Sequence, residues 1–171
     1  MRVANLLGTT ALAVTDVALS ETTRTAGVSA SGAAALLALS VSPGLSVTEL
    51  GCRVGLSQSA ARMVDSLESG GLVGRRRGDG RSVSVKLTNS GQRTARKLLT
   101  ARGAPLTEIV AVLDEDEQIA LVGLLSKLLT GLYEEIGNAH LICRLCDRKS
   151  CVRGAVWPVG QAERDEGAGS R

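Results

Sequence analysis

Three cysteines and the only histidine of the chain fall within a dozen residues near its carboxyl end. They are His140, Cys143, Cys146 and Cys151. The Cys-x-x-Cys step brings two thiolates toward one metal ion, and Cys151 or His140 could complete a tetrahedral zinc site or leave one corner of an iron–sulfur cluster open. The same thiols could instead sense redox changes, because cations such as Arg144, Arg148 and Lys149 favour the reactive thiolate. Chemically inert cysteines are the third possibility.

A second group of residues with binding chemistry is strongly basic. Five cations lie within a dozen residues, with only Asp79 opposing them: Arg75, Arg76, Arg77, Arg81 and Lys86. Guanidinium groups match phosphate oxygens in geometry and charge. The net charge of +3 is modest, so the placement of the arginines matters more than the total. An isolated arginine run is usually a solvated face. Whether this run binds phosphate instead depends on the elements that surround it.

The residues before the basic run predict two short helices joined by a tight turn. Ser46 and Glu49 have the spacing of a capping box, and Gly55 is placed to end that helix after about two turns. Ser57 is expected to cap the next helix, which buries Ala60, Ala61, Val64 and Leu67 and ends at Gly70-Gly71. The pattern is that of a helix-turn-helix.

Two strands are expected directly afterwards, over residues 72–77 and 82–87. The connection contains Asp79-Gly80, a pair that favours a tight hairpin turn. An arginine-tipped hairpin after a helix-turn-helix favours DNA contact over a solvated face. The amino end of the second helix would meet base edges in the major groove, while the arginines would lie along phosphates or enter the minor groove. The expected DNA-binding residues are Ser57, Gln58, Ser59, Arg62, Arg75, Arg76, Arg77, Asp79 and Arg81.

The stretch from Ser46 to Gly91 resembles the winged helix of MarR-family transcription regulators. The likeness lies in Thr48-Glu49-Leu50, Arg62 to Glu68, Gly71-Leu72-Val73, Asp79-Gly80-Arg81 and Val85 to Gly91. The resemblance implies a mainly helical fold with a small β-hairpin wing, and a homodimer that binds a palindromic site in double-stranded DNA. It implies a transcription regulator, which we expect to be a repressor, and it gives Asp79 the role of orienting a neighbouring arginine. Gly74 departs from the pattern, because the family often has an acid there.

Cys143-Arg144-Leu145-Cys146-Asp147 resembles a tail found in a subset of that family. The tail usually continues to a further cysteine before Pro-Val, whereas here Trp157 precedes Pro158-Val159. Cys52 is expected to pack as a small apolar residue of a helix. The alternative function is a metal-dependent protein-interaction module that uses this cysteine segment.

The remaining sequence predicts long helices on both sides of the winged helix. A helix over 3–26, one ending near 42, one over 90–102 and a wide-faced apolar one from Asp114 to Ile136 are expected. The expected units are an N-terminal dimerisation helix (1–28), the DNA-binding domain (29–89), C-terminal dimerisation helices (90–141), a cysteine-rich segment (142–159) and a disordered tail (160–171). These long helices are expected to pack against a second copy of the chain.

Composition argues against two other classes of protein. The chain has one histidine and lacks a Gly-x-Ser-x-Gly elbow, a phosphate loop and a His-Glu-x-x-His helix, so we do not expect an enzyme. No uninterrupted apolar stretch reaches the ~20 residues that span a bilayer, so no membrane partner is expected. A cytoplasmic location with reduced cysteines follows from this interpretation.

Overall fold

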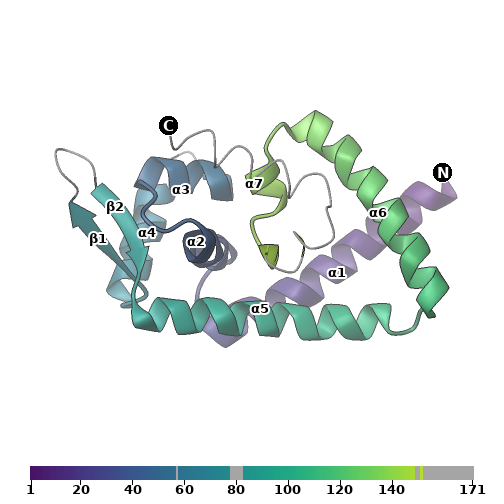
Figure 1. Ribbon diagram of the computed structural model, residues 1–171, viewed down its shortest axis with the longest axis horizontal. Coiled ribbons are helices and arrows are strands. Elements are labelled where there is room, and N and C mark those ends of the chain that lie inside the picture. Colours follow the sequence, from purple (N-terminus) through teal and green to yellow (C-terminus); the bar gives the residue numbers. More distant parts are fainter. Residues whose placement is uncertain (57, 78–82, 149–150, 152–171) are drawn as a thin grey trace.

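The computed structural model describes residues 1–56, 58–77, 83–148 and 151. Helices dominate, and the two strands form one antiparallel sheet (Figure 1). This confirms the predicted fold class. The elements are α1 (Arg2–Ala26), α2 (Ala30–Val41), α3 (Val47–Val54), α4 (Ala60–Ser69), β1 (Val73–Arg77), β2 (Val83–Leu87), α5 (Asn89–Val110), α6 (Glu115–Ile136) and α7 (Ala139–Ile142).

The first helix of the helix-turn-helix begins and ends as the sequence predicts. The Glu49 backbone N–H donates to Ser46 Oγ, and the Ser46 N–H donates to Glu49 Oε2 at 2.8 Å, which completes the capping box of α3. Gly55 ends the helix in the left-handed conformation, with φ of 77°. Glycine adopts that conformation without a steric penalty from Cβ.

The start and the inward face of α4 differ from the prediction. The helix begins at Ala60, and its N-cap residue is Ser59, whose side chain makes no capping hydrogen bond. The predicted cap, Ser57, lies outside the described residues. Met63 is buried, whereas Ala61 is exposed. The later start leaves the inward stripe on Ala60, Met63, Val64 and Leu67, the spacing of one helix face.

The hairpin is anchored to the segment that precedes α3. β1 pairs with β2 in a register that places Arg75 opposite Val85. The Val85 N–H donates to Leu45 O at 2.8 Å, and the Gly44 N–H donates to Val85 O at 3.1 Å. Backbone hydrogen bonds therefore hold β2 on both of its sides. The predicted Asp79-Gly80 turn lies outside the described residues.

One aliphatic core joins the helix-turn-helix, the hairpin and the first half of α5. Its largest fully buried hydrophobic side chains come from five elements: Leu36 and Leu39 of α2, Leu50 of α3, Val64 of α4, Val85 of β2 and Leu98 of α5. Burying side chains of this size is worth roughly 1.5–3 kcal/mol each. The core fixes the position of α4 relative to the hairpin.

α5 is longer than predicted. It runs past Arg102 and through Pro105 to Val110, and it packs along α1 (Figure 1). Proline removes one helical N–H and normally favours a helix end. Leu106 of α5 lines a cavity together with Val14 and Leu19 of α1. The two helices pack along each other, and this packing favours the continuation of α5 past the local breaking signal.

α6 extends from the end of α5 as an arm (Figure 1). Asp114 caps it in a second capping box with Glu117, as expected of a helix that starts at Asp114. None of its residues, all of which the structure describes, is buried. The short helix α7 follows and was not predicted. It packs against α3, and the Asn138 Nδ2 group donates to Cys52 O at 3.5 Å.

α1 bears on the expectation that the chain has no membrane partner. Arg2–Arg24 forms a helix that is long and apolar enough to cross a bilayer by length and composition, with only 6% of its most apolar window buried. Asp16 and Glu21 interrupt the apolar run, and its spacing is that of an amphipathic helix. One such helix near a chain start is weak evidence for a membrane span, since core helices and signal sequences pass the same test.

Candidate nucleic-acid interface and thiol cluster

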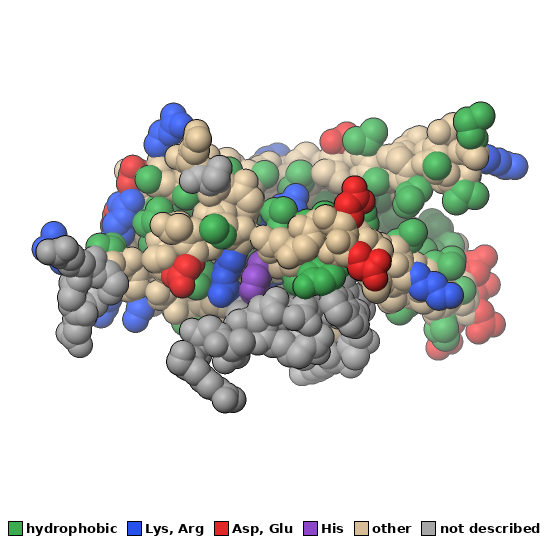
Figure 2. All heavy atoms as spheres, turned by 90° about the horizontal axis from the view of Figure 1, so that it is seen from above, with side chains coloured by type: hydrophobic (Ala, Val, Ile, Leu, Met, Phe, Trp, Pro, Cys, Tyr) green, Lys and Arg blue, Asp and Glu red, His purple; other side chains and the backbone are tan. Residues whose placement is uncertain are grey.

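The amino end of α4 and the adjoining hairpin form one face of the molecule. Gln58 and Arg62 are exposed at this end of α4, and Ser59 is half-buried. On the wing, Arg76 and Arg77 are exposed near the tip of β1. Figure 2 shows Lys and Arg side chains at the hairpin end of the molecule. The structure thus brings the described members of the predicted DNA-reading set onto neighbouring elements.

Arg75 is positioned differently from the other wing arginines. Its side chain is 30% exposed and turns back to α4, where Nη2 lies 2.6 Å from Asp65 Oδ1 and Nη1 donates to Glu68 Oε2. The Arg75 backbone N–H also donates to Glu68 Oε1 at 3.2 Å. The hydrogen bond with Asp65 raises the pKa of the Arg75 guanidinium. Arg75 therefore ties the wing to α4 in addition to any contact with DNA.

Three of the predicted DNA-binding residues cannot be placed. Ser57, Asp79 and Arg81 lie outside the described residues. The Arg75 ion pairs have a signal in the sequence. Asp65 and Glu68 are three residues apart on α4, a spacing that puts two carboxylates on one face.

The apolar surface lies at the other end of the molecule, on α1 and α6 (Figure 2). Ile119, Val122 and Leu124 of α6 are each at least 60% exposed. The same helix also exposes four further large apolar side chains: Leu125, Leu128, Leu132 and Ile136. α1 adds Val3, Leu6, Leu7, Leu12 and Val17. Exposed apolar surface on this scale marks an interaction site more often than single exposed side chains do.

The cysteines after α7 lie together, while Cys52 lies apart. Cys143 is buried and Cys146 and Cys151 are half-buried, whereas Cys52 is exposed on α3. The prediction that Cys52 packs as a buried apolar residue was wrong, because its position faces away from the core stripe formed by Leu50 and Val54.

The thiol of Cys146 has an unusual electrostatic environment. Hydrogen bonding from the Cys143 thiol lowers the pKa of Cys146 to about 6, and Arg102 of α5, the Cys151 thiol and Arg148 act in the same direction against burial. The pKa of Cys143 is raised, chiefly by its hydrogen bond to Cys146 and by burial. Burial also raises the pKa of Cys151. The thiolate of the cluster therefore forms on Cys146.

The expected metal ligands are all described. Among the described residues, which include all four cysteines and His140, no group of three or more His, Cys, Asp or Glu side chains is arranged to hold a metal ion. His140 lines a small cavity with Cys143 and Cys146. The proximity of the three cysteines therefore offers thiol chemistry without a formed metal cage.

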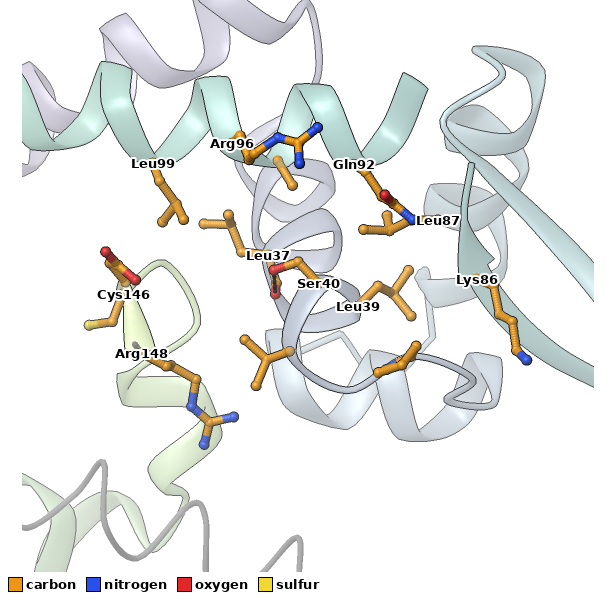
Figure 3. A pocket seen from close by; sticks show the side chains of 14 residues that line it. Leu37, Leu39, Ser40, Lys86, Leu87, Gln92, Arg96, Leu99, Cys146 and Arg148 are labelled. Carbon is orange, nitrogen blue, oxygen red and sulfur yellow. Dashed lines mark hydrogen bonds between the residues drawn. The ribbon is translucent and has the colours of Figure 1, made fainter. Parts of the chain in front are cut away.

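A larger cavity lies between α2, β2, α5 and the cysteine segment, with a volume of about 430 Å³ (Figure 3). Leu37, Leu39 and Leu99 supply apolar walls, and Lys86 and Arg96 supply positive charge. Figure 3 shows Cys146 at the edge of this cavity, with its sulfur turned away from the centre.

Neither a protein-family model nor a curated protein matches the sequence, but solved structures share its fold. A MarR family protein from Bacillus stearothermophilus matches with a TM-score of 0.68 at 23% identity, covering 77% of this chain and 93% of that chain. MepR, a transcription regulator of the Staphylococcus aureus multidrug efflux pump MepA, matches with a TM-score of 0.67 at 17% identity, covering 75% and 97%. A MarR family regulator from Silicibacter pomeroyi matches with 0.57 at 28% identity, covering 75% and 88%. These structural neighbours are transcription regulators, and the shared fold is the winged helix-turn-helix.

Proposed function

We propose that this chain is a DNA-binding transcription regulator of the MarR kind that works as a homodimer in the cytoplasm. The observation that carries the proposal is the attachment of a basic hairpin to the second half of α4 by the ion pairs of Arg75 with Asp65 and Glu68, while the amino end of the same helix stays exposed. These contacts fix the position of the amino end of α4, which would enter the major groove, relative to the wing arginines, which would follow the phosphate backbone of the DNA. The likeness to solved regulators supports the same function.

On the recognition helix, we assign base reading to the exposed end. Gln58 suits adenine and Arg62 suits guanine or a phosphate. On the wing, Arg76 and Arg77 supply attraction to phosphates, which gives affinity more than sequence preference. Arg75 acts as a positioning residue that holds the wing against α4.

The homodimer is inferred from α6 and the outer half of α1. In the part of the chain that the structure describes, α6 exposes seven large apolar side chains and has no buried residue, and helices depend on packing of an apolar face for most of their stability. A second copy related by a twofold axis would cover the same patch on both chains. The pair would present two recognition helices to half-sites about 10 base pairs apart.

The experiment that tests this function is a gel shift with DNA from upstream of the chain's own gene, competed by unrelated DNA. We expect sequence-selective binding by the natural chain and loss of selectivity in Arg62→Ala. Arg2→Ala serves as the matched control. It removes the same charge at the start of α1, at the end of the molecule away from the hairpin (Figure 1). Equal behaviour of the two variants would favour the alternative function, a protein-interaction module that uses the cysteine segment.

The signal and the direction of regulation follow as separate predictions. Repression is checked by a reporter under the same upstream DNA, with and without the chain. A bound zinc ion or iron–sulfur cluster stays a prediction from the Cys-x-x-Cys step, although the described cysteines and His140 form no arrangement for a metal. Metal analysis and the absorption spectrum of protein isolated without oxygen decide it.

A further inference from the structure

We infer that Thr88 is a positioning residue that sets the distance between the two recognition helices of the homodimer, and with it the half-site spacing that the chain accepts. The inference rests on the proposed function, which supplies the dimer and its DNA. It starts from the segment between Val85 and Gly91, which closes the hairpin and contains none of the predicted DNA-binding residues.

The end of α4 is firmly connected to the chain that follows it. The Gly71 N–H donates to Glu68 O at 2.9 Å, and the Leu72 N–H donates to Leu67 O at 2.9 Å. Gly71 adopts the left-handed conformation, with φ of 67°. These are the two hydrogen bonds and the backbone conformation of a Schellman motif. The carbonyl groups of Gly71 and Leu72 therefore move with the recognition helix.

Thr88 binds both of these carbonyl groups. Its hydroxyl donates to Gly71 O at 2.7 Å, and the hydroxyl oxygen lies 3.2 Å from Leu72 O. The Thr88 backbone N–H donates to Leu72 O at 3.0 Å. The same hydroxyl oxygen accepts the Gly91 N–H at 3.0 Å, which caps the amino end of α5. One side chain thus joins the end of α4 to the start of α5.

The backbones of the two elements come very close at this point. A Cβ at Gly91 would lie 1.9 Å from Leu72 O, so a residue with a side chain would push the elements apart. We call the contact of Thr88 and Gly91 with the carbonyl groups of Gly71 and Leu72 the α4–α5 joint.

The joint is the directional contact between α5 and the DNA-binding lobe. Farther along the helix, α5 buries Ala95 and Leu98 in the aliphatic core. Apolar contacts of this kind are non-directional, whereas a hydrogen bond weakens steeply when its angle changes. The joint therefore fixes the angle of α5 more strictly than the core contacts do.

The length of α5 turns a small change at the joint into a large change at the DNA. The helix has 22 residues, and at 1.5 Å per residue it is roughly 33 Å long. Figure 1 shows it leading from the foot of the hairpin to α6, which carries the proposed dimer surface. A tilt of about 6° over that length shifts the recognition helix by roughly 3.4 Å, the rise of one base pair.

Three substitutions at Thr88 separate the link to α4 from the cap of α5. Thr88→Val removes the hydroxyl, and with it both functions, while it keeps the branched shape. Thr88→Asp keeps an acceptor for the Gly91 N–H, but an ionised carboxylate has no proton to donate to Gly71 O. Thr88→Ser keeps both functions. Because Thr88→Asp retains the helix cap, it decides the question if Thr88→Val does not fold.

Thr100→Val is the matched control. It makes the same change on the same helix, at an exposed position. The Thr100 hydroxyl bonds within α5, to Arg96 O at 3.3 Å, so its loss leaves the joint intact.

The test measures Kd by fluorescence anisotropy for three duplexes. One is a palindrome that the natural chain selects from a random pool, and the other two have one base pair inserted or removed at its centre. We expect the natural chain to bind the altered duplexes about tenfold or more weakly, because the second recognition helix then misses its half-site. Thr88→Val and Thr88→Asp should show a difference of about threefold or less, since a loosened joint lets each helix follow its half-site. Thr88→Ser and Thr100→Val should keep the natural ratio.

The ratio of Kd values distinguishes positioning from a loss of stability. A variant that is only less stable has fewer folded molecules, which raises Kd for all three duplexes by the same factor. A natural ratio in Thr88→Val or Thr88→Asp, or a reduced ratio in Thr88→Ser, would overturn the inference. Equal binding of the three duplexes by the natural chain would overturn it too, without affecting the proposed function. A natural chain that binds no duplex would overturn the proposed function and this inference together.

Discussion

Arg75 of the wing and Asp65 of the recognition helix are joined by a hydrogen-bonded ion pair, with 2.6 Å between Nη2 and Oδ1. The two residues are ten positions apart in the chain, and their contact crosses from β1 to α4. Glu68 accepts from the same guanidinium. An arginine that the sequence offers as a phosphate ligand is thus also the group that sets the angle between wing and helix.

Replacing Arg75 with alanine should therefore affect both folding and binding. We expect a loss of about 0.5–1 kcal/mol in the free energy of unfolding, the scale of partly exposed ion pairs, together with weaker DNA binding. Urea unfolding and anisotropy measure the two effects. Arg76→Ala, at the exposed neighbouring position, should weaken binding without changing stability. Equal stability of the two variants would show that the ion pairs do not hold the wing.

The exposed wing arginines should determine the salt dependence of binding. A dimer that neutralises about six phosphates gives a slope near −5 for the logarithm of affinity against the logarithm of salt concentration. Arg77→Ala removes one cation from each chain, so the slope should become shallower by about two units per dimer. Arg2→Ala should leave the slope unchanged. A natural chain whose affinity ignores salt would contradict the assignment of the wing.

The apolar face of α6 should be the dimer surface. Leu128 is 45% exposed, and Leu128→Glu would place a carboxylate against a symmetric copy of the same face. We expect this variant to sediment as a monomer and to bind DNA about tenfold more weakly or worse, since both half-sites can no longer be engaged together. Lys127→Glu adds the same carboxylate at the preceding position, which is also exposed, and should stay dimeric. A dimeric Leu128→Glu would mean that the copies meet elsewhere.

The reactivity of Cys146 should depend on pH in a shifted range. Its pKa is lowered from 9.0 to about 6, so the thiolate is already the main form at neutral pH. The alkylation rate of Cys146 should therefore rise with a midpoint near pH 6 and level off above it, whereas an ordinary cysteine has its midpoint near 9. Arg102→Ala should move the midpoint upward, because it removes one stabilising charge. Iodoacetamide labelling followed by mass spectrometry gives the rate for each cysteine. Among the described residues, the groups that act on this thiol are Cys143, Cys151, Arg148 and Arg102. Asp147, His140, Arg144, Arg53 and Arg96 line cavities that Cys146 also lines.

Two glycines of α5 should respond in opposite directions to the same substitution. A Cβ at Gly91 would lie 1.9 Å from Leu72 O, whereas nothing lies within 4 Å of one at Gly103. Gly91→Ala should therefore destabilise the fold by about 1–3 kcal/mol or more, as overpacking does. Gly103→Ala should stabilise it by roughly 0.5–1 kcal/mol through helix propensity. Thermal unfolding of both variants checks the pair, and a tolerated Gly91→Ala would place α5 farther from β1.

Local signals predicted the elements whose ends depend on neighbouring residues. The Ser46–Glu49 box, the left-handed Gly55 and the start at Asp114 are each determined within one turn of chain. The length of α5 could not be read in this way, since Gly103 and Pro105 indicate a helix end and only packing against α1 opposes them. The inward position of Met63 depends on where α4 begins, which the core decides.

The candidate site also has residues that local sequence predicts and residues whose positions depend on tertiary structure. Gln58 and Arg62 could be chosen from helix position alone, because the amino end of a recognition helix is the part that meets base edges. The attachment of Arg75 to α4 could not be predicted in this way, because it depends on how the hairpin folds back on α4. The nearness of Cys146 to Arg102 also depends on tertiary structure, since 44 positions separate them in the sequence, and only the return of the chain after α6 brings them together.

Selection of duplexes from a random pool by the full-length chain tests most directly whether one helix-and-wing surface is presented twice. Each selected duplex should bind two copies of the chain. The enriched sequences should be palindromes with half-sites about 10 base pairs apart. Absence of any enrichment at low ionic strength, or enrichment of single unpaired half-sites by one chain, would contradict the proposal.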